Sequence, residues 1–275
     1  MKRRALLAEA TARLAAAGIA DAAREARILL RRASGLGAGL AAALDDPAGP
    51  AEVARLRADV AERARRRPMA QILGEREFWG RRFRVTADVL DPRPDTETLI
   101  EAALALGPRR RLLDLGTGSG AILLTLLAEW PGATALGIDA SAAALAVARD
   151  NARRLGVADR ARLRQGDWLD GVAGRFDLIL CNPPYIPEAE LAALEPEVRD
   201  WEPRIALTPG GDGLEVYRRL APRLAAHLQP GGAALFEIGR GQDRAVAGIL
   251  AAAGLARIAF RNDLNGVPRC VIVQP

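Results

Sequence analysis

Apolar residues recur at helical spacing through the first part of the chain, with short breaks between the apolar runs. This pattern predicts three amphipathic helices, at residues 6–17, 22–33 and 51–66. Gly18 ends the first helix, and the run Pro47-Ala48-Gly49-Pro50 interrupts the chain before the last one. None of these segments carries an obvious catalytic group. We therefore interpret residues 1–75 as a small helical bundle that docks a partner, with a simple folding cap as the alternative.

The pattern changes between residues 76 and 94, where two short strand-like runs surround Gly80 and predict a β-hairpin. The chain then enters the segment Pro92-Arg93-Pro94. Because Asp and Thr are favoured at helix N-caps, we expect Asp95 or Thr96 to cap a helix that begins near Glu97. The hairpin segment is therefore interpreted as a linker between two domains.

From about residue 95 onward, strand-like runs alternate with helical segments, and this order predicts an α/β fold with an open, Rossmann-like sheet. The expected strands are residues 111–115, 133–139, 161–165, 176–181 and 233–238, followed by two runs that can pair at 256–261 and 269–273. The expected organisation is thus a helical domain (1–75), a β-hairpin linker (76–94) and an α/β domain (95–275).

The length and composition of the chain limit its class. With 275 residues, half of them hydrophobic, the chain can form one large domain and one small one. No apolar run approaches the roughly 18 to 20 residues of a membrane-spanning helix. The only cysteines, Cys181 and Cys270, fit neither a disulfide framework nor a metal site. We therefore expect a cytoplasmic protein that does not associate with membranes.

The charged residues exclude several kinds of chemistry. The net charge is +5 and the pI about 10.1, and arginine supplies nearly all of the positive charge because Lys2 is the only lysine. This excess of positive charge weakly favours an acidic partner such as RNA, although a general bias of the composition toward arginine explains most of the excess. The lack of further lysines excludes P-loop and Schiff-base chemistry. The single histidine, His227, makes a Ser-His-Asp triad or a histidine-based metal site a poor candidate.

The most informative motif is Asn182-Pro183-Pro184-Tyr185, which directly follows the expected strand at 176–181. Two adjacent prolines cannot continue a sheet, because neither has an N–H group for the strand ladder. The chain therefore leaves the strand as a stiff loop at its carboxyl end, which is the edge of an α/β sheet where ligands bind. The amide, the main-chain carbonyls and the aromatic ring suit a planar amide or amino group, although a simple proline turn would also explain the motif.

A second set of candidate residues follows the other expected strands. The run Asp114-Leu115-Gly116-Thr117-Gly118-Ser119-Gly120 lies between the first strand and its helix, where glycines let main-chain N–H groups approach a ligand closely. This run also fits a dinucleotide-binding fingerprint. Asp139, at the end of the second strand, is placed to accept hydrogen bonds from ribose hydroxyls, with a helix cap as the alternative.

Asp167 and Trp168 follow the third strand and add a carboxylate and an aromatic face, which suit the amino group and the ring of adenine. Core packing explains Trp168 equally well when it is taken alone. The ligand that best fits the whole set is S-adenosyl-L-methionine, because it carries ribose, adenine and an amino-acid tail but no phosphate. The sequence therefore predicts a site for this methyl donor beside the loop that begins at Asn182.

Further motifs extend over nearly the whole chain: Gly74 with Phe78 and Gly80, Glu202-Pro203, Ala206-Leu207, Gly211-Asp212-Gly213-Leu214, and Glu237-Ile238-Gly239 with Gln242. Together with Pro92-Arg93-Pro94 and Thr96-Glu97, the most specific segment, they make the chain resemble the bacterial protein-(glutamine-N5) methyltransferases of peptide-chain release factors, the HemK or PrmC family. Three positions depart from the family pattern: Gln71, Asp91 and Asp95.

The resemblance implies a methyltransferase catalytic domain that acts on the glutamine in the Gly-Gly-Gln (GGQ) loop of a release factor. Together with the residue pattern, the resemblance indicates which residues bind the cofactor: Gly116, Thr117, Gly118, Ser119, Gly120, Asp139, Asp167, Trp168 and Asn182. The residues expected to hold the substrate are Asn182, Pro183, Pro184 and Tyr185, with catalytic roles for Asn182, Pro183 and Tyr185. The ribosome is a further candidate partner, and we expect a monomer with no metal site and no direct nucleic-acid substrate.

Three other functions would use parts of the same pattern. A nucleic-acid exocyclic-amine methyltransferase of the N6-adenine type would hold a base with the loop at Asn182, but the N-terminal helices lack a basic and aromatic surface for base flipping. A nicotinamide-dependent oxidoreductase would leave Asn182 and Tyr185 unexplained. A catalytically silent docking module would not need intact site motifs.

Overall fold

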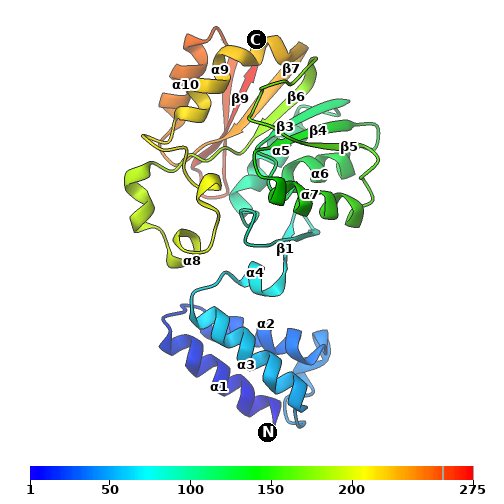
Figure 1. Cartoon of the computed structure of the whole chain (residues 1–275), viewed down its shortest axis with the longest axis vertical. Helices are drawn as coiled ribbons and strands as arrows, with labels where there is room; N and C mark the ends of the chain where they lie inside the picture. The colour runs from blue at the N-terminus through cyan, green and yellow to red at the C-terminus, as the bar shows by residue number, and fades with distance from the viewer. Residues whose placement is uncertain (256, 275) are drawn as a thin grey trace. The chain divides into compact units, whose positions relative to one another are not determined.

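The structure, a computed structural model, describes residues 1–255 and 257–274 (Figure 1). It consists of two compact units. The helical unit comprises Met1–Gly74 together with a later segment, Glu195–Trp201, and the sheet unit comprises Glu75–Leu194 and the described residues from Glu202 onward. The β-hairpin that the sequence pattern assigns to a linker thus belongs to the sheet unit. The later segment of the helical unit is not predicted by any local pattern.

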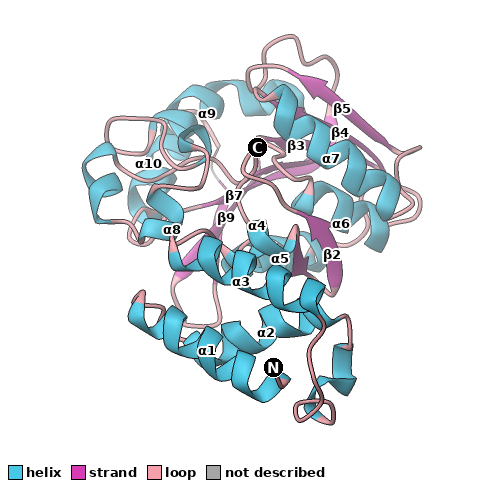
Figure 2. Ribbon diagram, turned by 60° about the horizontal axis from the view of Figure 1, so that its bottom comes forward, coloured by secondary structure: helices cyan, strands magenta, loops and turns pink. Residues whose placement is uncertain are grey.

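The helical unit is a bundle in which each main helix buries one apolar face. Its elements are α1 (Arg3–Ala16), α2 (Ala22–Ser34), η1 (a 3-10 turn, Gly37–Ala41), α3 (Pro50–Ala64), α4 (Met69–Leu73) and the short helix α8 (Pro196–Arg199). Leu6, Leu14, Leu29, Leu30 and Leu56 are buried in one cluster between α1, α2 and α3, which lie side by side (Figure 2). These are the three helices that the apolar spacing predicts.

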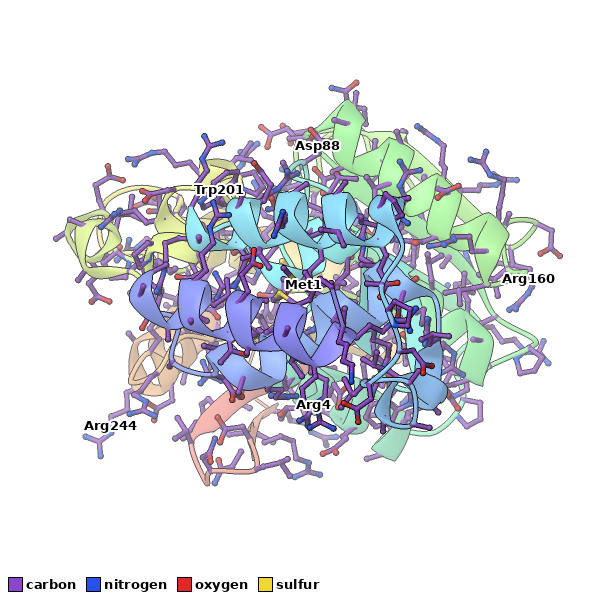
Figure 3. The ribbon with its side chains drawn as sticks, turned by 90° about the horizontal axis from the view of Figure 1, so that it is seen from below. Met1, Arg4, Asp88, Arg160, Trp201 and Arg244 are labelled. Carbon is purple, nitrogen blue, oxygen red and sulfur yellow. The ribbon has the colours of Figure 1, made fainter. Side chains whose placement is uncertain are left out.

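A buried arginine joins the later segment to this bundle. Arg63, on α3, is only 6% exposed, and it donates to Glu25 Oε2 at 2.5 Å and to Glu197 Oε1 at 2.9 Å. Trp201, which is labelled in Figure 3, donates from its ring nitrogen to the main-chain carbonyl of Arg65 at the end of α3. The segment is therefore held to the helices by hydrogen bonds between residues far apart in the sequence.

The sheet unit is built on a seven-stranded sheet in the order β5-β4-β3-β6-β7-β9-β8. Its strands are β3 (Arg111–Leu115), β4 (Thr134–Asp139), β5 (Ala161–Gln165), β6 (Phe176–Cys181), β7 (Leu228–Glu237), β8 (Arg257–Asn262) and β9 (Pro268–Gln274). β9 is antiparallel to both of its neighbours, and the other pairs are parallel. An antiparallel hairpin, β1 (Glu75–Phe78) with β2 (Arg81–Arg84), precedes the sheet.

Helices cover both faces of the sheet. They are α5 (Glu97–Ala105), α6 (Ala121–Glu129), α7 (Ala142–Arg154), α9 (Glu215–His227) and α10 (Asp243–Ala252), with 3-10 turns η2 (Pro94–Thr96), η3 (Glu188–Ala193) and η4 (Arg204–Ala206). α5, α6 and α7 contribute to one buried cluster, and α9 and α10 contribute to the other, on the opposite face of the sheet (Figure 1). Consecutive strand residues such as Leu112 and Leu113 therefore enter different clusters. The predicted α/β fold with a helical N-terminal domain is confirmed.

The strand order reverses between β3 and β6, and this reversal positions the site. β3 is followed along the chain by β4 on one side of it, whereas β6 is followed by β7 on the other side. Ligands of open α/β sheets bind at such a switch point, outside the carboxyl ends of the strands. The glycine loop after β3 and the Asn-Pro-Pro-Tyr loop after β6 both begin there.

Two expectations from composition can be compared with the fold. Among the described residues, no helix is both long enough and apolar enough to cross a membrane. Cys181 on β6 and Cys270 on β9 are free thiols buried in the core of the sheet unit. Burial raises the pKa of the Cys181 thiol well above its ordinary value, so this thiol stays protonated at neutral pH.

Replacing Arg63 by Ala is expected to destabilise the protein by about 3 kcal/mol, because two partly buried carboxylates lose their common partner. Arg57, on the same helix, is the matched control. Its pair with Glu9 is about half exposed and screened by solvent, so Arg57→Ala should destabilise the protein far less. Urea titration of both variants gives the free energies of unfolding, and equal losses would contradict the role assigned to Arg63.

Candidate active site

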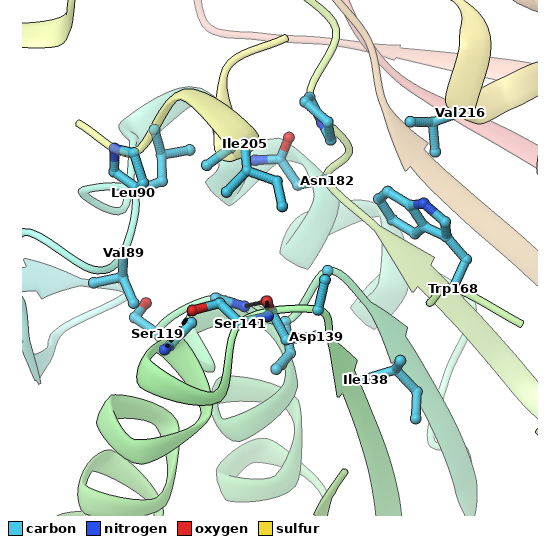
Figure 4. A pocket seen from close by; sticks show the side chains of 18 of the residues that line it. Val89, Leu90, Ser119, Ile138, Asp139, Ser141, Trp168, Asn182, Ile205 and Val216 are labelled. Atoms are coloured by element: carbon cyan, nitrogen blue, oxygen red, sulfur yellow. Dashed lines mark hydrogen bonds between the residues drawn. The ribbon is translucent and has the colours of Figure 1, made fainter. Parts of the chain in front are cut away.

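The sheet unit contains a cavity of about 480 Å³ at the carboxyl ends of β3, β4, β5 and β6 (Figure 4). Loops before α5 and α9 complete its walls. The expected site residues that line it are Gly116, Thr117, Gly118, Ser119, Asp139, Asp167, Trp168, Asn182 and Pro184. The expected residues that lie outside its lining are Gly120, Pro183 and Tyr185. The topology thus brings together residues that are separated along the chain.

The glycine loop after β3 has a backbone that glycine adopts with little strain. Gly116, Gly118 and Gly120 have φ angles of 73°, 55° and 81°. A Cβ on Gly120 would lie 2.7 Å from the Leu124 side chain, whereas no atom lies within 4 Å of a Cβ on Gly118. A side chain at position 120 would therefore displace the Leu124 side chain, whereas the space next to Gly118 is open.

Asp139 ties the glycine loop to the end of β4. Its Oδ2 accepts from the Gly118 main-chain N–H and its Oδ1 from the Ser141 N–H, each at 2.8 Å (Figure 4). Ser141 in turn caps α7, because its hydroxyl accepts from the Ala144 N–H at 3.1 Å. The helix cap that was the alternative role for Asp139 thus belongs to Ser141. The Asp139 carboxylate lines the cavity and keeps lone pairs for a ligand.

Asp114 supports the same loop from within the protein, although the sequence pattern did not mark it as a site residue. It is fully buried, and its Oδ2 accepts from the Thr117 hydroxyl at 2.6 Å. Burial raises the pKa of Asp114 to about 7, the Thr117 hydroxyl opposes that rise, and the negative charge of Asp139 adds to it. Its position at the end of a buried strand, just before the glycines, is the signal that could have identified it.

Asp167 and Trp168 are adjacent in sequence but have different surroundings. Both oxygens of Asp167 accept from Arg219 on α9, at 2.9 and 2.5 Å. Trp168 has a φ of 52°, and its ring lies 3.3 Å from the position of a Cβ on Gly116. The ring also packs against the core cluster of α9 and α10, and it borders the cavity (Figure 4). Trp168 therefore combines the packing role and the cavity role that the sequence left as alternatives.

The loop after β6 places Asn182 beside the glycine loop. The Asn182 main-chain carbonyl lies 3.9 Å from the position of a Cβ on Gly116. The Asn182 side chain donates from Nδ2 to Thr96 Oγ1 at 3.2 Å, which leaves Oδ1 available as an acceptor. Pro183 is buried, and Pro184 lines the cavity.

Tyr185 does not line the cavity, which differs from the expectation that its ring packs on the substrate. Its hydroxyl donates to Glu237 Oε1 at 3.2 Å, and its carbonyl accepts from Gln242 Nε2 at 2.9 Å. A Cβ on Gly213, which has a φ of 81°, would overlap that carbonyl, so glycine leaves room for it. The two hydrogen bonds hold Tyr185 in place beside the loop.

Glu237, at the end of β7, is a second buried carboxylate that the sequence pattern did not assign to the site. It is 1% exposed, and burial raises its pKa to about 7. The hydroxyls of Thr96 and Tyr185 and the charge of Arg269 oppose this rise, whereas the charge of Asp95 adds to it. Glu237 Oε2 has no hydrogen-bond partner among the described residues.

The segment before α5 and the loop before α9 form one edge of the cavity. Leu90 and Ile205 lie together at this edge (Figure 4). Arg93, from the same segment, pairs with the buried Glu202 at 2.7 Å. Asp91, the charged departure from the family pattern, is buried, and its pKa is raised by burial, with Arg76 at 3.8 Å opposing the rise. The charges at this edge are therefore paired or desolvated.

The fold and this site define a methyltransferase. The family model described as "Methyltransferase small domain" matches residues 88–223, which contain the glycine loop, Asp139 and the Asn-Pro-Pro-Tyr loop. A second family model, "PrmC N-terminal domain", matches residues 5–74 of the helical unit.

Solved structures share this fold at low sequence identity. A methyltransferase from Pyrococcus furiosus is 17% identical with a TM-score of 0.54, over 71% of this chain and 89% of that chain. The hMettl16 catalytic domain in complex with MAT2A 3'UTR hairpin 1 is 17% identical with a TM-score of 0.62, over 78% of this chain and 80% of that chain. At these identities the likeness concerns the fold alone.

Curated relatives give the particular family. The release factor glutamine methyltransferase of Cereibacter sphaeroides is 58% identical over 96% of this chain and 95% of its own length. The protein of the same name from Rhodospirillum rubrum is 49% identical, over 95% of this chain and 82% of its own length. The chain belongs to the release factor glutamine methyltransferase family, in agreement with the resemblance found in its motifs.

The buried Asp114 carboxyl predicts a pH dependence of stability. Its pKa is raised from 3.8 to about 7 in the folded protein, so the folded state binds this proton more tightly. The contribution to stability is therefore fully present below about pH 4 and is lost as the pH rises to about 7. Between pH 5 and pH 8, the wild type should lose about 2 to 3 kcal/mol relative to Asp114→Asn, which does not titrate.

Urea unfolding of both proteins at the two pH values measures this difference. Asp150→Asn is the control, because the partly exposed Asp150 carboxyl has a pKa that Arg84 lowers, and it stays ionised throughout this range. A constant difference between wild type and Asp114→Asn would show that Asp114 titrates at its ordinary pKa.

Proposed function

We propose that this chain transfers a methyl group from S-adenosyl-L-methionine to the side-chain amide nitrogen of the glutamine in the GGQ loop of peptide-chain release factors. Membership of the release factor glutamine methyltransferase family supports this substrate. The observation that carries the proposal is the shared cavity, in which the glycine loop and Asp139 border the same space as Asn182. A methyl donor and an acceptor nitrogen can therefore meet there.

The cavity suits a methyl donor better than a dinucleotide. Its volume of about 480 Å³ lies in the range of small-molecule sites. The two arginines in its described lining are both paired with carboxylates, Arg93 with Glu202 and Arg219 with Asp167. Neither arginine is therefore free to neutralise a phosphate, which S-adenosyl-L-methionine lacks and a nicotinamide cofactor carries.

Three features would hold the donor in this proposal. The glycine loop would approach it with main-chain N–H groups, Asp139 would accept from the ribose hydroxyls, and Trp168 would flank the adenine. Each Asp139 oxygen accepts a single main-chain hydrogen bond and has a lone pair left for a ribose. The pairing of Asp167 with Arg219 makes Asp167 a weaker acceptor for the adenine amino group than its sequence position indicates.

The acceptor nitrogen presents the chemical difficulty, because the lone pair of an amide nitrogen is delocalised into its carbonyl. The donor supplies a methyl group that its sulfonium already activates, so the protein has to orient the nitrogen. In this proposal Asn182 Oδ1 and the Pro183 carbonyl each accept one N–H of the glutamine amide, and the lone pair turns toward the methyl group. Such alignment can contribute roughly 7 to 11 kcal/mol. The nitrogen becomes acidic on methylation and then releases its proton without a strong base.

A labelling experiment tests the substrate class. The protein is incubated with methyl-labelled S-adenosyl-L-methionine and, separately, with release factor, with release factor whose GGQ glutamine is replaced by Ala, and with nucleic acid. The proposal requires label on the unaltered release factor alone. Label on nucleic acid would favour the exocyclic-amine methyltransferase instead.

Asn182→Ala should lower kcat for release factor methylation by about 100-fold or more, because one of the two acceptors that orient the nitrogen is lost. Cofactor binding should weaken less, since the glycine loop and Asp139 are unchanged. Turnover under saturating substrates and calorimetry with S-adenosyl-L-methionine measure the two effects on the same variant. Near-normal turnover would refute the proposed role of Asn182.

Asp139→Ala should weaken the binding of S-adenosyl-L-methionine by about 10-fold or more, because hydrogen bonds to a charged acceptor are lost. Part of this loss comes from the Gly118 N–H, which also loses its acceptor. Calorimetry measures the Kd, and Asp150→Ala, which removes a partly exposed carboxylate from α7, is the control. An unchanged Kd in Asp139→Ala would count against the ribose assignment.

A further inference from the structure

The amide of Gln242 joins the end of the Asn-Pro-Pro-Tyr loop to the segment after β7. Its Nε2 donates to the Tyr185 carbonyl and its Oε1 accepts from the Gly239 main-chain N–H, each at 2.9 Å. Gln242 lies at the N-terminus of α10, yet its side chain makes no capping hydrogen bond to that helix. It does not line the cavity either. The proposed chemistry therefore leaves Gln242 without a role.

The polarity of the main chain fixes the direction of this amide. A carbonyl oxygen can only accept a hydrogen bond, and a main-chain N–H can only donate one. With the amide reversed, the NH2 group of Gln242 would face the N–H of Gly239, and its oxygen would face the oxygen of Tyr185. The observed orientation is therefore the one that makes both hydrogen bonds.

Two glycines make room for this contact. Gly239 is buried, and a Cβ there would lie 2.9 Å from Gln242 Oε1 and 3.1 Å from the Tyr185 ring. A Cβ on Gly213 would overlap the Tyr185 carbonyl. Both glycines lie in motifs on which the family resemblance rests. These two motifs thus meet at the residue that Gln242 binds.

The Asn-Pro-Pro-Tyr loop is stiff and is held at both ends. At its start, the last residue of β6 is paired with both neighbouring strands. At its end, Gln242 holds the Tyr185 carbonyl. Between these ends, each proline has a φ of about −65° and restricts the residue before it. A shift of Tyr185 would therefore also move Asn182 and the Pro183 carbonyl.

We propose that Gln242 is a positioning residue for methyl transfer. Through the Tyr185 carbonyl, it holds the Asn-Pro-Pro-Tyr loop where Asn182 Oδ1 and the Pro183 carbonyl reach the acceptor nitrogen. This inference rests on the proposed function of those two acceptors and adds the residue that fixes the end of their loop. The side-chain partners of Gln242, Tyr185 and Gly239, lie outside the lining of the cavity, so the binding of the methyl donor should depend little on Gln242.

Gln242→Glu and Gln242→Met test the two hydrogen bonds separately. Glutamate keeps an acceptor for the Gly239 N–H but places an oxygen against the Tyr185 carbonyl, whereas methionine keeps the length of the side chain and makes neither bond. We expect kcat for release factor methylation to fall about 10- to 100-fold in both variants, because a displaced loop misaligns the nitrogen. The Kd for S-adenosyl-L-methionine, measured by calorimetry, should stay within about threefold of the wild-type value.

Gln229→Met is the matched control. Gln229 lies near the start of β7, at the opposite end of the strand from the loop after β6, so this variant should keep wild-type kcat. Wild-type kcat in Gln242→Glu would overturn the inference. A Kd for the methyl donor that rises as much as kcat falls would also overturn it, because the loss would then not be specific to the acceptor loop.

Amide hydrogen exchange needs no release factor and so separates this inference from the proposed function. The Gly239 N–H should exchange slowly in the wild type and in Gln242→Glu, and faster in Gln242→Met. The Ile186 N–H, which donates to the Leu207 carbonyl at 3.0 Å directly after the loop, should exchange faster in both variants. Unchanged exchange at Ile186 in both variants would overturn the inference even if release factor is methylated. Faster exchange there, in a protein that does not methylate release factor, would refute the proposed function and support the role of Gln242 in holding the loop.

Discussion

The site depends on hydrogen bonds to carboxylates that lie where the strands of the sheet end. Helices cover both faces of the sheet, so water has little access to the strands, and a charge there is costly unless donors reach it. Asp114 on β3, Asp139 on β4 and Glu237 on β7 all accept hydrogen bonds from the loops of the site. These bonds fix the loops relative to the sheet and so give the cavity defined walls.

The three carboxylates divide into two kinds by their burial. Asp114 and Glu237 are almost fully buried, and burial raises the pKa of each to about 7. Asp139 is partly exposed and lines the cavity. The inner two can therefore act only by holding other protein groups, Thr117 in one case and Tyr185 in the other. Asp139 can hold its loop and also meet a ligand.

The strands and most helices of the sheet unit could be predicted because apolar runs and glycines act locally. Partners far apart in sequence could not be predicted from the residues alone. Thr96 has the residue type of a helix cap, yet its hydroxyl meets a side chain 86 positions away. Asp167 lines the cavity as expected of a cofactor-binding residue, and its carboxylate also pairs with Arg219, which lies 52 positions away. Such pairings depend on which elements approach each other in the fold. Local sequence patterns do not give these approaches, so only a resemblance to a known family can indicate them from the sequence.

The segment around Pro92-Arg93-Pro94, the most specific match to the family, connects several parts of the sheet unit. Arg93 is extended between two prolines, and the chain then turns sharply through η2. The next three side chains reach three parts of the sheet unit: Asp95 pairs with Arg269, Thr96 accepts from Asn182, and Glu97 accepts from the Trp79 main-chain N–H at 2.8 Å. The Asn-Pro-Pro-Tyr loop alone suits an amide or a nucleobase. The segment thus contacts both the loop that begins at Asn182 and the β1–β2 hairpin of the sheet unit.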